Sequence, residues 1–171
     1  QHPYMQIFTK YASAFSGANT VLVSLRWKGD GDIYNRTFMD KLRHATDDVF
    51  FIQGVERPRV YSLFTPNVRY TEVTEDGFRG DVVLPGRFSG TPEELDQVRS
   101  NVARSGQIGR LVSNDLKSAL IRAELSEVDP TTGKAIDYSR VAHELEAIRA
   151  KFSGQDVEVN IVGFAKLVGD V

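Results

Sequence analysis

Apolar residues recur along this chain with two different periods, one typical of strands and one typical of helices. Apolar and polar side chains alternate around residues 21–27 and 117–125, which predicts a strand in each place. Apolar residues at helical spacing follow each predicted strand, and a second run of strand-like residues follows each predicted helix. The predicted elements are strand 21–27, helix 33–49 and strand 58–64, then strand 117–125, helix 137–152 and strand 157–161.

Residues that favour helix starts mark three of the boundaries. Asp32 and Asp137 are predicted to cap the helices of the two strand–helix–strand units, because a carboxylate accepts hydrogen bonds from the free N–H groups of a first turn. A third helix is predicted to begin after Thr91, since Pro92 suits the first helical position and Glu94 completes a capping box.

The order strand–helix–strand therefore occurs twice. Right-handed crossovers would place both helices on one face of a shared sheet, which predicts an α+β fold of the ferredoxin-like, split-βαβ type. A β-hairpin within 66–85 and the third helix are inserted between the units. We divide the chain into an N-terminal helical segment 1–19, a first βαβ unit 20–64, an insertion 65–116 and a second βαβ unit 117–171.

Composition and charge narrow the function classes. The 171 residues are 41% apolar and 26% charged, a mixture typical of a folded globular domain. The net charge of −2 argues against a nucleic-acid partner, which usually requires a basic surface. The chain has no cysteine, which excludes disulfides, thiolate zinc sites and cysteine nucleophiles.

We find no motif that predicts catalysis, a metal site or a cofactor. His2, His44 and His143 lack the i, i+4 spacing of a helical metal site, and we expect the latter two to be exposed on helices. The sequence Asp30-Gly31-Asp32 resembles the start of a calcium loop, but Tyr34 stands where a third oxygen ligand is needed. The prediction is a protein that is not an enzyme and holds no cofactor.

Four aromatic residues in or beside the insertion are the candidate contact residues. They are Phe64, Tyr70, Phe78 and Phe88. One interpretation is that they pack in the core. The other is that they line an apolar groove for a hydrophobic substrate or a packing surface for a neighbouring domain.

Several segments together resemble a known family. They are His2-Pro3-Tyr4, Gly17-Ala18-Asn19-Thr20-Val21, Phe64-Thr65-Pro66-Asn67-Val68, residues 72–78, Gly109-Arg110-Leu111-Val112-Ser113 and residues 162–170. Over nearly the whole chain they resemble the first large extracytoplasmic loop of exporters of the RND superfamily, MMPL type. None of these segments is a catalytic motif.

The resemblance implies the porter region of a transporter with twelve membrane helices in two similar halves. Such a protein lies in the inner (cytoplasmic) membrane, and this segment would be periplasmic or otherwise extracytoplasmic. Its partners would be the membrane helices and the second porter loop of the same transporter, and its substrates hydrophobic or lipid-like. Export in the family is driven by protons that bind within the membrane helices, so no proton-binding residue carries over to this chain.

The two ends of the chain fit the same expectation. It begins without methionine and stops after an apolar stretch, as a segment of a longer protein does, although a secreted protein after signal removal is an alternative. Other functions also stay open. The chain is alternatively a ferredoxin-like small-molecule sensor or regulatory domain, a stand-alone enzyme on that fold, or a loop with an assembly role alone.

Overall fold

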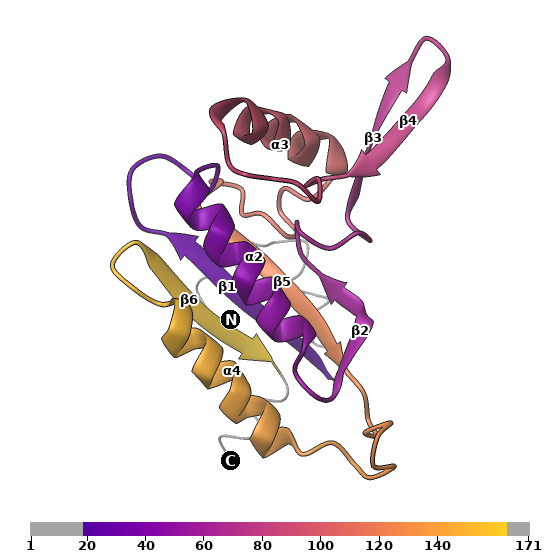
Figure 1. Ribbon diagram of the computed structural model, residues 1–171, viewed down its shortest axis with the longest axis vertical. Coiled ribbons are helices and arrows are strands. Elements are labelled where there is room, and N and C mark those ends of the chain that lie inside the picture. The colour runs from indigo at the N-terminus through magenta and orange to yellow at the C-terminus, as the bar shows by residue number, and fades with distance from the viewer. Residues whose placement is uncertain (1–18, 164–171) are drawn as a thin grey trace.

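The computed structural model describes residues 19–163, which form an α+β fold with two antiparallel sheets (Figure 1). Residues 1–18 of the predicted N-terminal helical segment lie outside the described residues, as do residues 164–171. The elements are β1 Thr20–Trp27, α2 Arg36–Phe50, β2 Val55–Tyr61, β3 Arg69–Thr74, β4 Gly77–Val82, α3 Pro92–Ser105, β5 Ser118–Leu125, α4 Tyr138–Phe152 and β6 Val157–Gly163.

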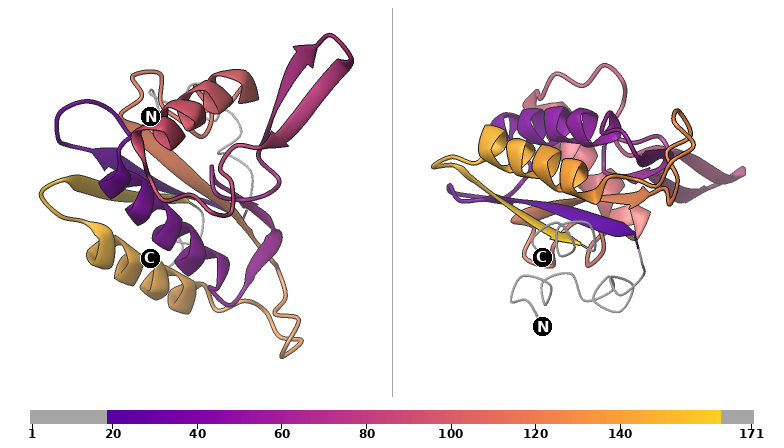
Figure 2. Two further views of the ribbon diagram at one scale, coloured as in Figure 1. Left: turned by 45° about the horizontal axis from the view of Figure 1, so that its top comes forward. Right: turned by 90° about the horizontal axis from the view of Figure 1, so that it is seen from below.

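The larger sheet has the strand order β2-β5-β1-β6, and every neighbouring pair is antiparallel. The two strands of each βαβ unit are therefore separated by a strand of the other unit. Helices α2 and α4 both lie on one face of this sheet (Figure 2). This arrangement confirms the predicted fold class, because interleaved units with both helices on one face make up a split-βαβ sandwich.

The core lies between the sheet and the two helices. The strand residues that face the helices alternate along β1, where Val21, Val23 and Leu25 are buried. On α4 the predicted apolar stripe is buried throughout, from Val141 to Phe152. Each such side chain contributes on the order of 1.5–3 kcal/mol when it leaves water. The core continues into the insertion, where Val98 and Val102 of α3 are buried.

The first helix starts later than predicted. Asn35, and not Asp32, is the N-cap of α2, because its side chain accepts a hydrogen bond from the Phe38 amide at 2.8 Å. Asp32 instead accepts a hydrogen bond from the Tyr34 amide and forms an ion pair with Arg99 of α3 at 2.7 Å. The other two caps were predicted correctly: Thr91 and Glu94 form a capping box on α3, and Asp137 caps α4.

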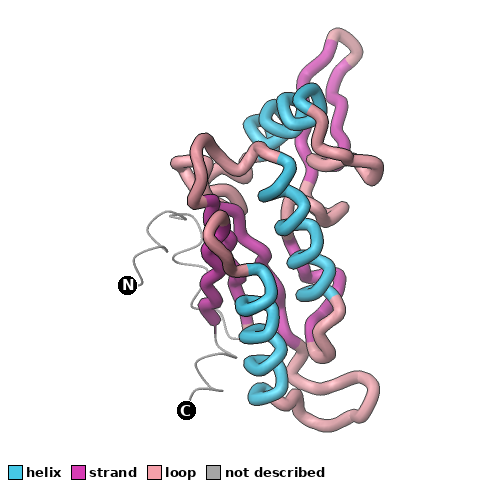
Figure 3. The backbone as a smooth tube through the Cα atoms, turned by 60° about the vertical axis from the view of Figure 1, so that its left-hand side comes forward, coloured by secondary structure: helices cyan, strands magenta, loops and turns pink. Residues whose placement is uncertain are grey.

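The insertion lies at one end of the molecule. Strands β3 and β4 form a two-stranded hairpin that projects from the body, with α3 beside its base (Figure 3). Glu72 of β3 pairs with Arg79 of β4 at 2.7 Å and with Arg104 of α3 at 3.7 Å. The Arg99–Asp32 pair joins α3 in turn to the loop before α2, so ion pairs link hairpin, helix and core in series.

A further ion pair attaches the segment before β5 to the sheet. The Asp115 carboxylate accepts hydrogen bonds from Arg26 at 2.8 Å, from the Ser113 hydroxyl at 2.6 Å and from the Lys117 amide at 3.0 Å. Partial burial acts to raise the pKa of Asp115, but these bonds favour the charged form more strongly and lower the pKa to about 2.

We expect Asp115→Asn to lower the free energy of unfolding by about 1 kcal/mol at pH 7. The Asp115 side chain is 44% exposed, so solvent screening reduces the effect below what the pKa shift alone implies. Because the folded-state pKa lies below the ordinary value of 3.8, the stabilisation is complete above about pH 4 and is lost as the pH falls toward 2. Urea unfolding at several pH values measures this. Asp47→Asn, on the exposed side of α2, is the control; a wild-type advantage over Asp115→Asn that persists undiminished at pH 2 would contradict the prediction.

Candidate binding groove

A large bulge in β2 shapes the surface beside α2. Val55 pairs with Leu125 and Val60 pairs with Ala123, so five residue steps on β2 correspond to two on β5. Three extra residues must leave the plane of the sheet between these pairs. This corrects the predicted strand at 58–64: the strand starts at Val55, and Pro58, which has no amide hydrogen for a ladder, lies in the bulge.

The bulge and the end of α2 enclose an apolar hollow of about 420 Å³, and a second hollow of about 210 Å³ adjoins it. Both are lined by Phe50, Thr65 and Pro66, so they form one continuous depression. We call this depression the aromatic groove. Its apolar lining consists of Phe50, Phe51, Pro58, Val60, Phe64 and Pro66.

A buried network of hydroxyl groups holds one wall of the aromatic groove. The hydroxyls of Thr46 and Ser62 are 2.7 Å apart, and Thr46 also donates to the Leu42 carbonyl at 2.7 Å. The Thr65 hydroxyl accepts a hydrogen bond from the Ser62 amide at 2.9 Å and donates to Asn67 at 2.6 Å. The turn at 62–67 is thereby fixed against α2, since buried polar groups strongly favour the arrangement that pairs them.

Arg57 provides the charge at the rim of the aromatic groove. Its guanidinium lies 5.7 Å from the ring centre of Phe50 and 5.4 Å from that of Phe51. These two rings meet edge to face at 5.3 Å. An arginine stacked on aromatic faces is held in a defined orientation and gains a cation–π attraction of roughly 0.5–1 kcal/mol at an exposed site.

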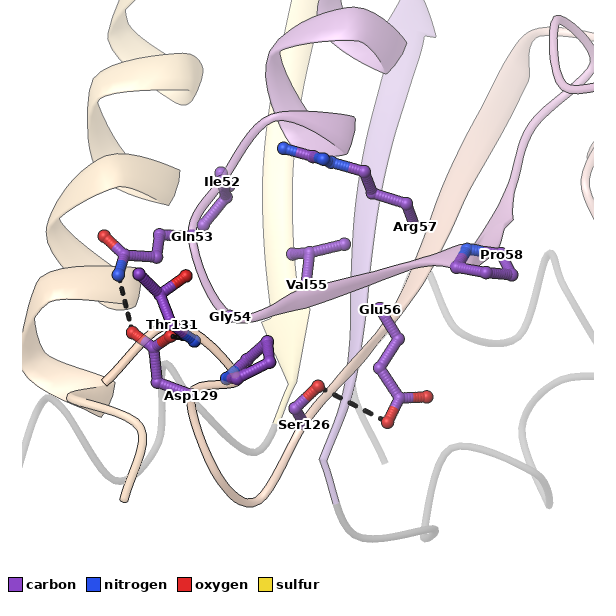
Figure 4. A pocket seen from close by; sticks show the side chains of 11 residues that line it. Ile52, Gln53, Gly54, Val55, Glu56, Arg57, Pro58, Ser126, Asp129 and Thr131 are labelled. Carbon is purple, nitrogen blue, oxygen red and sulfur yellow. Dashed lines mark hydrogen bonds between the residues drawn. The ribbon is translucent and has the colours of Figure 1, made fainter. Parts of the chain in front are cut away.

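A hollow of about 370 Å³ with mixed polar and apolar lining lies between the start of β2 and the loop that contains Asp129 and Thr131 (Figure 4). Gln53 donates a hydrogen bond of 2.5 Å to Asp129, and the Asp129 carboxylate also accepts one from the Thr131 amide at 2.8 Å. These hydrogen bonds hold the pKa of Asp129 below its usual value, and the bond from the Thr131 amide has the largest effect. Asp129 is therefore a poor general base, and we interpret the hollow as a structural loop junction.

The four predicted aromatic residues do not gather at one place. Phe64 lines the aromatic groove and meets Phe88 edge to face at 6.3 Å. Phe88 and Tyr70 are buried, whereas Phe78 is 81% exposed on the projecting hairpin opposite Val73. One residue thus lines the groove, two pack inside and one is exposed on the hairpin, away from the groove.

Sequence reasoning missed the other members of the aromatic groove. Phe50 and Phe51 end the helical pattern as an aromatic doublet, and adjacent helical positions cannot both face the same core. The doublet is therefore a usable signal for an aromatic residue directed outward, and Phe51 is 66% exposed. Arg57 could not be recognised from the sequence as a groove residue, because its place in the groove depends on the β2 bulge.

The histidines agree with their predicted placement, since His44 and His143 are exposed on α2 and α4. Within residues 19–163, no three His, Cys, Asp or Glu side chains are grouped so as to hold a metal ion. None of the described helices has the length and apolar character required to cross a membrane.

Comparison with family models and with curated proteins identifies no relative of this chain. No model of a known protein family matches the chain. No curated protein matches it either.

Proposed function

We propose that this chain is an extracytoplasmic porter-domain segment of a proton-driven RND-type exporter of hydrophobic or lipid-like substrates, in an inner-membrane protein of the MMPL type. The observation that carries the proposal is the aromatic groove: an open, mostly apolar depression whose charged lining residues are Arg57 in the larger hollow and Asp47 in the smaller one. Its wall at 64–67 belongs to a segment in which the chain resembles that family. The proposal assigns the domain a binding role and no catalytic step.

The topology suits a domain held between two membrane helices. β1 begins beside the point where β6 ends, with Val21 opposite Gly163. Both connections to flanking segments therefore leave from the same end of the sheet. A domain inserted between two neighbouring membrane helices needs this proximity.

The proposed cycle treats the domain as a unit that tilts against its partners, which are the membrane helices and the second porter loop. Proton binding within the membrane would favour one packing arrangement, and the aromatic groove would become open or covered accordingly. The ion pairs from Glu72 to Arg104 and from Arg99 to Asp32 support such motion, because they join the insertion to the sandwich.

A transport assay tests this proposal. We expect deletion of the gene to slow the energised efflux of a lipophilic dye such as Nile red, and the wild-type gene to restore it unless a protonophore is present. Phe51→Asp should fail to restore efflux, because a charged side chain in place of the ring removes apolar contact area and disfavours an apolar ligand in the aromatic groove. His143→Asp, an exposed polar change on α4, should restore it fully.

Equal efflux with and without the gene, under conditions in which the protein is present in the membrane, would make the proposal wrong. If the purified chain nevertheless bound a small molecule, the result would favour the sensor alternative. Restoration by Phe51→Asp at the wild-type rate would remove the aromatic groove from the transport route.

A further inference from the structure

Arg57 differs from most arginines of this chain in lacking a carboxylate partner. Arginines 26, 59, 99 and 140, among others, lie within 4.0 Å of an aspartate or glutamate. Within residues 19–163, no such ion pair involves Arg57. Its positive charge is therefore not neutralised by the described protein, although it borders an apolar surface.

The surroundings of Arg57 restrict how its guanidinium meets a ligand. The rings of Phe50 and Phe51 lie beneath it, and its Nε donates a long hydrogen bond of 3.4 Å to the Phe50 carbonyl. The terminal nitrogens carry the remaining N–H donors. A planar guanidinium held in this way presents two parallel donors, which is the geometry that a carboxylate accepts.

The aromatic groove next to this cation is suited to a hydrocarbon chain. Phe50, Pro58 and Pro66 provide the apolar surface of its larger hollow, and the exposed Phe51 lines the smaller one. A volume of about 420 Å³ falls within the usual range for small-molecule sites. Arg57 and the aromatic groove together match a ligand with one negatively charged head and one apolar tail.

We propose that the aromatic groove binds a single-chain anionic amphiphile of the fatty-acid type, with the tail along Phe50, Pro58 and Pro66 and the carboxylate paired with Arg57. This inference rests on the proposed function in that it names the ligand class for the same site. Charge complementarity carries it: a carboxylate pairs with the Arg57 guanidinium while the chain leaves water. Asp47 lines the smaller hollow and disfavours a carboxylate there, so the head is assigned to the Arg57 end.

A second copy of the chain is the competing occupant. The hairpin tip presents Val73 and Phe78 as an exposed apolar pair, 79% and 81% exposed, close to the acidic turn at Glu75 and Asp76. That tip has the same combination of apolar surface and negative charge. The test must therefore measure self-association as well as ligand binding.

The experiment titrates the 171-residue chain with dodecanoate below its micelle concentration, using calorimetry and amide chemical shifts. We expect saturable binding with shifts concentrated at residues 50–67. Arg57→Gln should weaken dodecanoate binding about tenfold, because a charge-assisted hydrogen-bonded pair is lost. Arg87→Gln, at an exposed arginine outside the groove, should leave it unchanged.

Two further probes separate head from tail. Acetate should not saturate the site, and dodecyltrimethylammonium should bind the wild type at least tenfold more weakly than dodecanoate does. Arg57→Glu should reverse that preference. Far-UV circular dichroism and the thermal midpoint of each variant confirm that the fold is retained.

Any of three results would overturn the inference: no saturable binding of dodecanoate, equal binding of the anionic and cationic chains, or no difference between Arg57→Gln and Arg87→Gln. Self-association that Phe78→Ala abolishes, in the absence of saturable dodecanoate binding, would assign the aromatic groove to a second copy of the chain. Failure of this binding test leaves the efflux test unaffected, since that assay reports transport of any lipophilic dye. Conversely, dodecanoate binding without energised efflux would overturn the transport proposal alone.

Discussion

Phe38→Ala is expected to lower the free energy of unfolding by about 3–5 kcal/mol, the usual cost of truncating a fully buried phenylalanine. Phe38 lies on the inner side of α2 and is 0% exposed. Its ring meets Trp27 of β1 edge to face, with the ring centres 6.4 Å apart. Alanine would leave a cavity between α2 and the sheet, because close-packed neighbours collapse only in part. Urea unfolding followed by circular dichroism measures the loss.

Phe78→Ala is the matched control, since it removes the same atoms from a ring that is 81% exposed. We expect a change of less than about 0.5 kcal/mol, as is usual for surface positions. If the two variants unfolded at the same urea concentration, α2 would not pack through Phe38 as described. The comparison also separates the energetics of the sandwich from those of the hairpin.

The elements with a regular period could be predicted from the sequence, because their burial follows from local spacing. Along α4, Val141, Leu145 and Ile148 recur at helical intervals, and all three are buried. In β5 the alternating residues 119, 121, 123 and 125 are buried. The capping box at Thr91 was likewise visible, since its reciprocal hydrogen bonds need residues only three positions apart.

Features that depend on distant partners could not be predicted. The sequence predicts Asp32 as a helix cap because aspartate favours that position, yet its partner Arg99 lies 67 residues away along the chain. With Asp32 engaged there, Asn35 caps α2 three residues later. The size of the β2 bulge likewise depends on a distant partner: Pro58 disfavours a regular ladder, but only the pairing with β5 shows that five residue steps on β2 face two on β5.

The candidate site was predicted only in part for the same reason. Phe64 was named for its aromatic character and does line the aromatic groove. Tyr70 and Phe88 share that character but are buried, because aromatic rings serve cores and binding surfaces equally well. Arg57 became a candidate only when the bulge placed it over Phe50 and Phe51.

Gly54→Ala is the second substitution with a large expected effect, about 2–3 kcal/mol of destabilisation. Gly54 joins α2 to β2 with a φ of +103°, a backbone conformation that residues with a side chain rarely adopt. A Cβ there would also lie 3.0 Å from the Cδ1 of Ile136, closer than carbon atoms normally approach. The Gly54 carbonyl accepts a hydrogen bond from the Ser126 amide at 2.8 Å, so a shift of this turn would disturb the bulge beside it.

Two comparisons divide this effect into backbone strain and steric contact. Gly133→Ala introduces a Cβ at a φ of +71° with no atom within 4 Å, so it should cost only about 1 kcal/mol. Ile136→Val removes the Cδ1 atom, so Gly54→Ala should cost less in that background than in the wild type. Thermal and urea unfolding of the four proteins of this double-mutant cycle measure the coupling. Equal costs for the two glycine substitutions, with no coupling to Ile136, would show that the turn before β2 yields freely and that neither its backbone conformation nor its contact with Ile136 holds it in the described position.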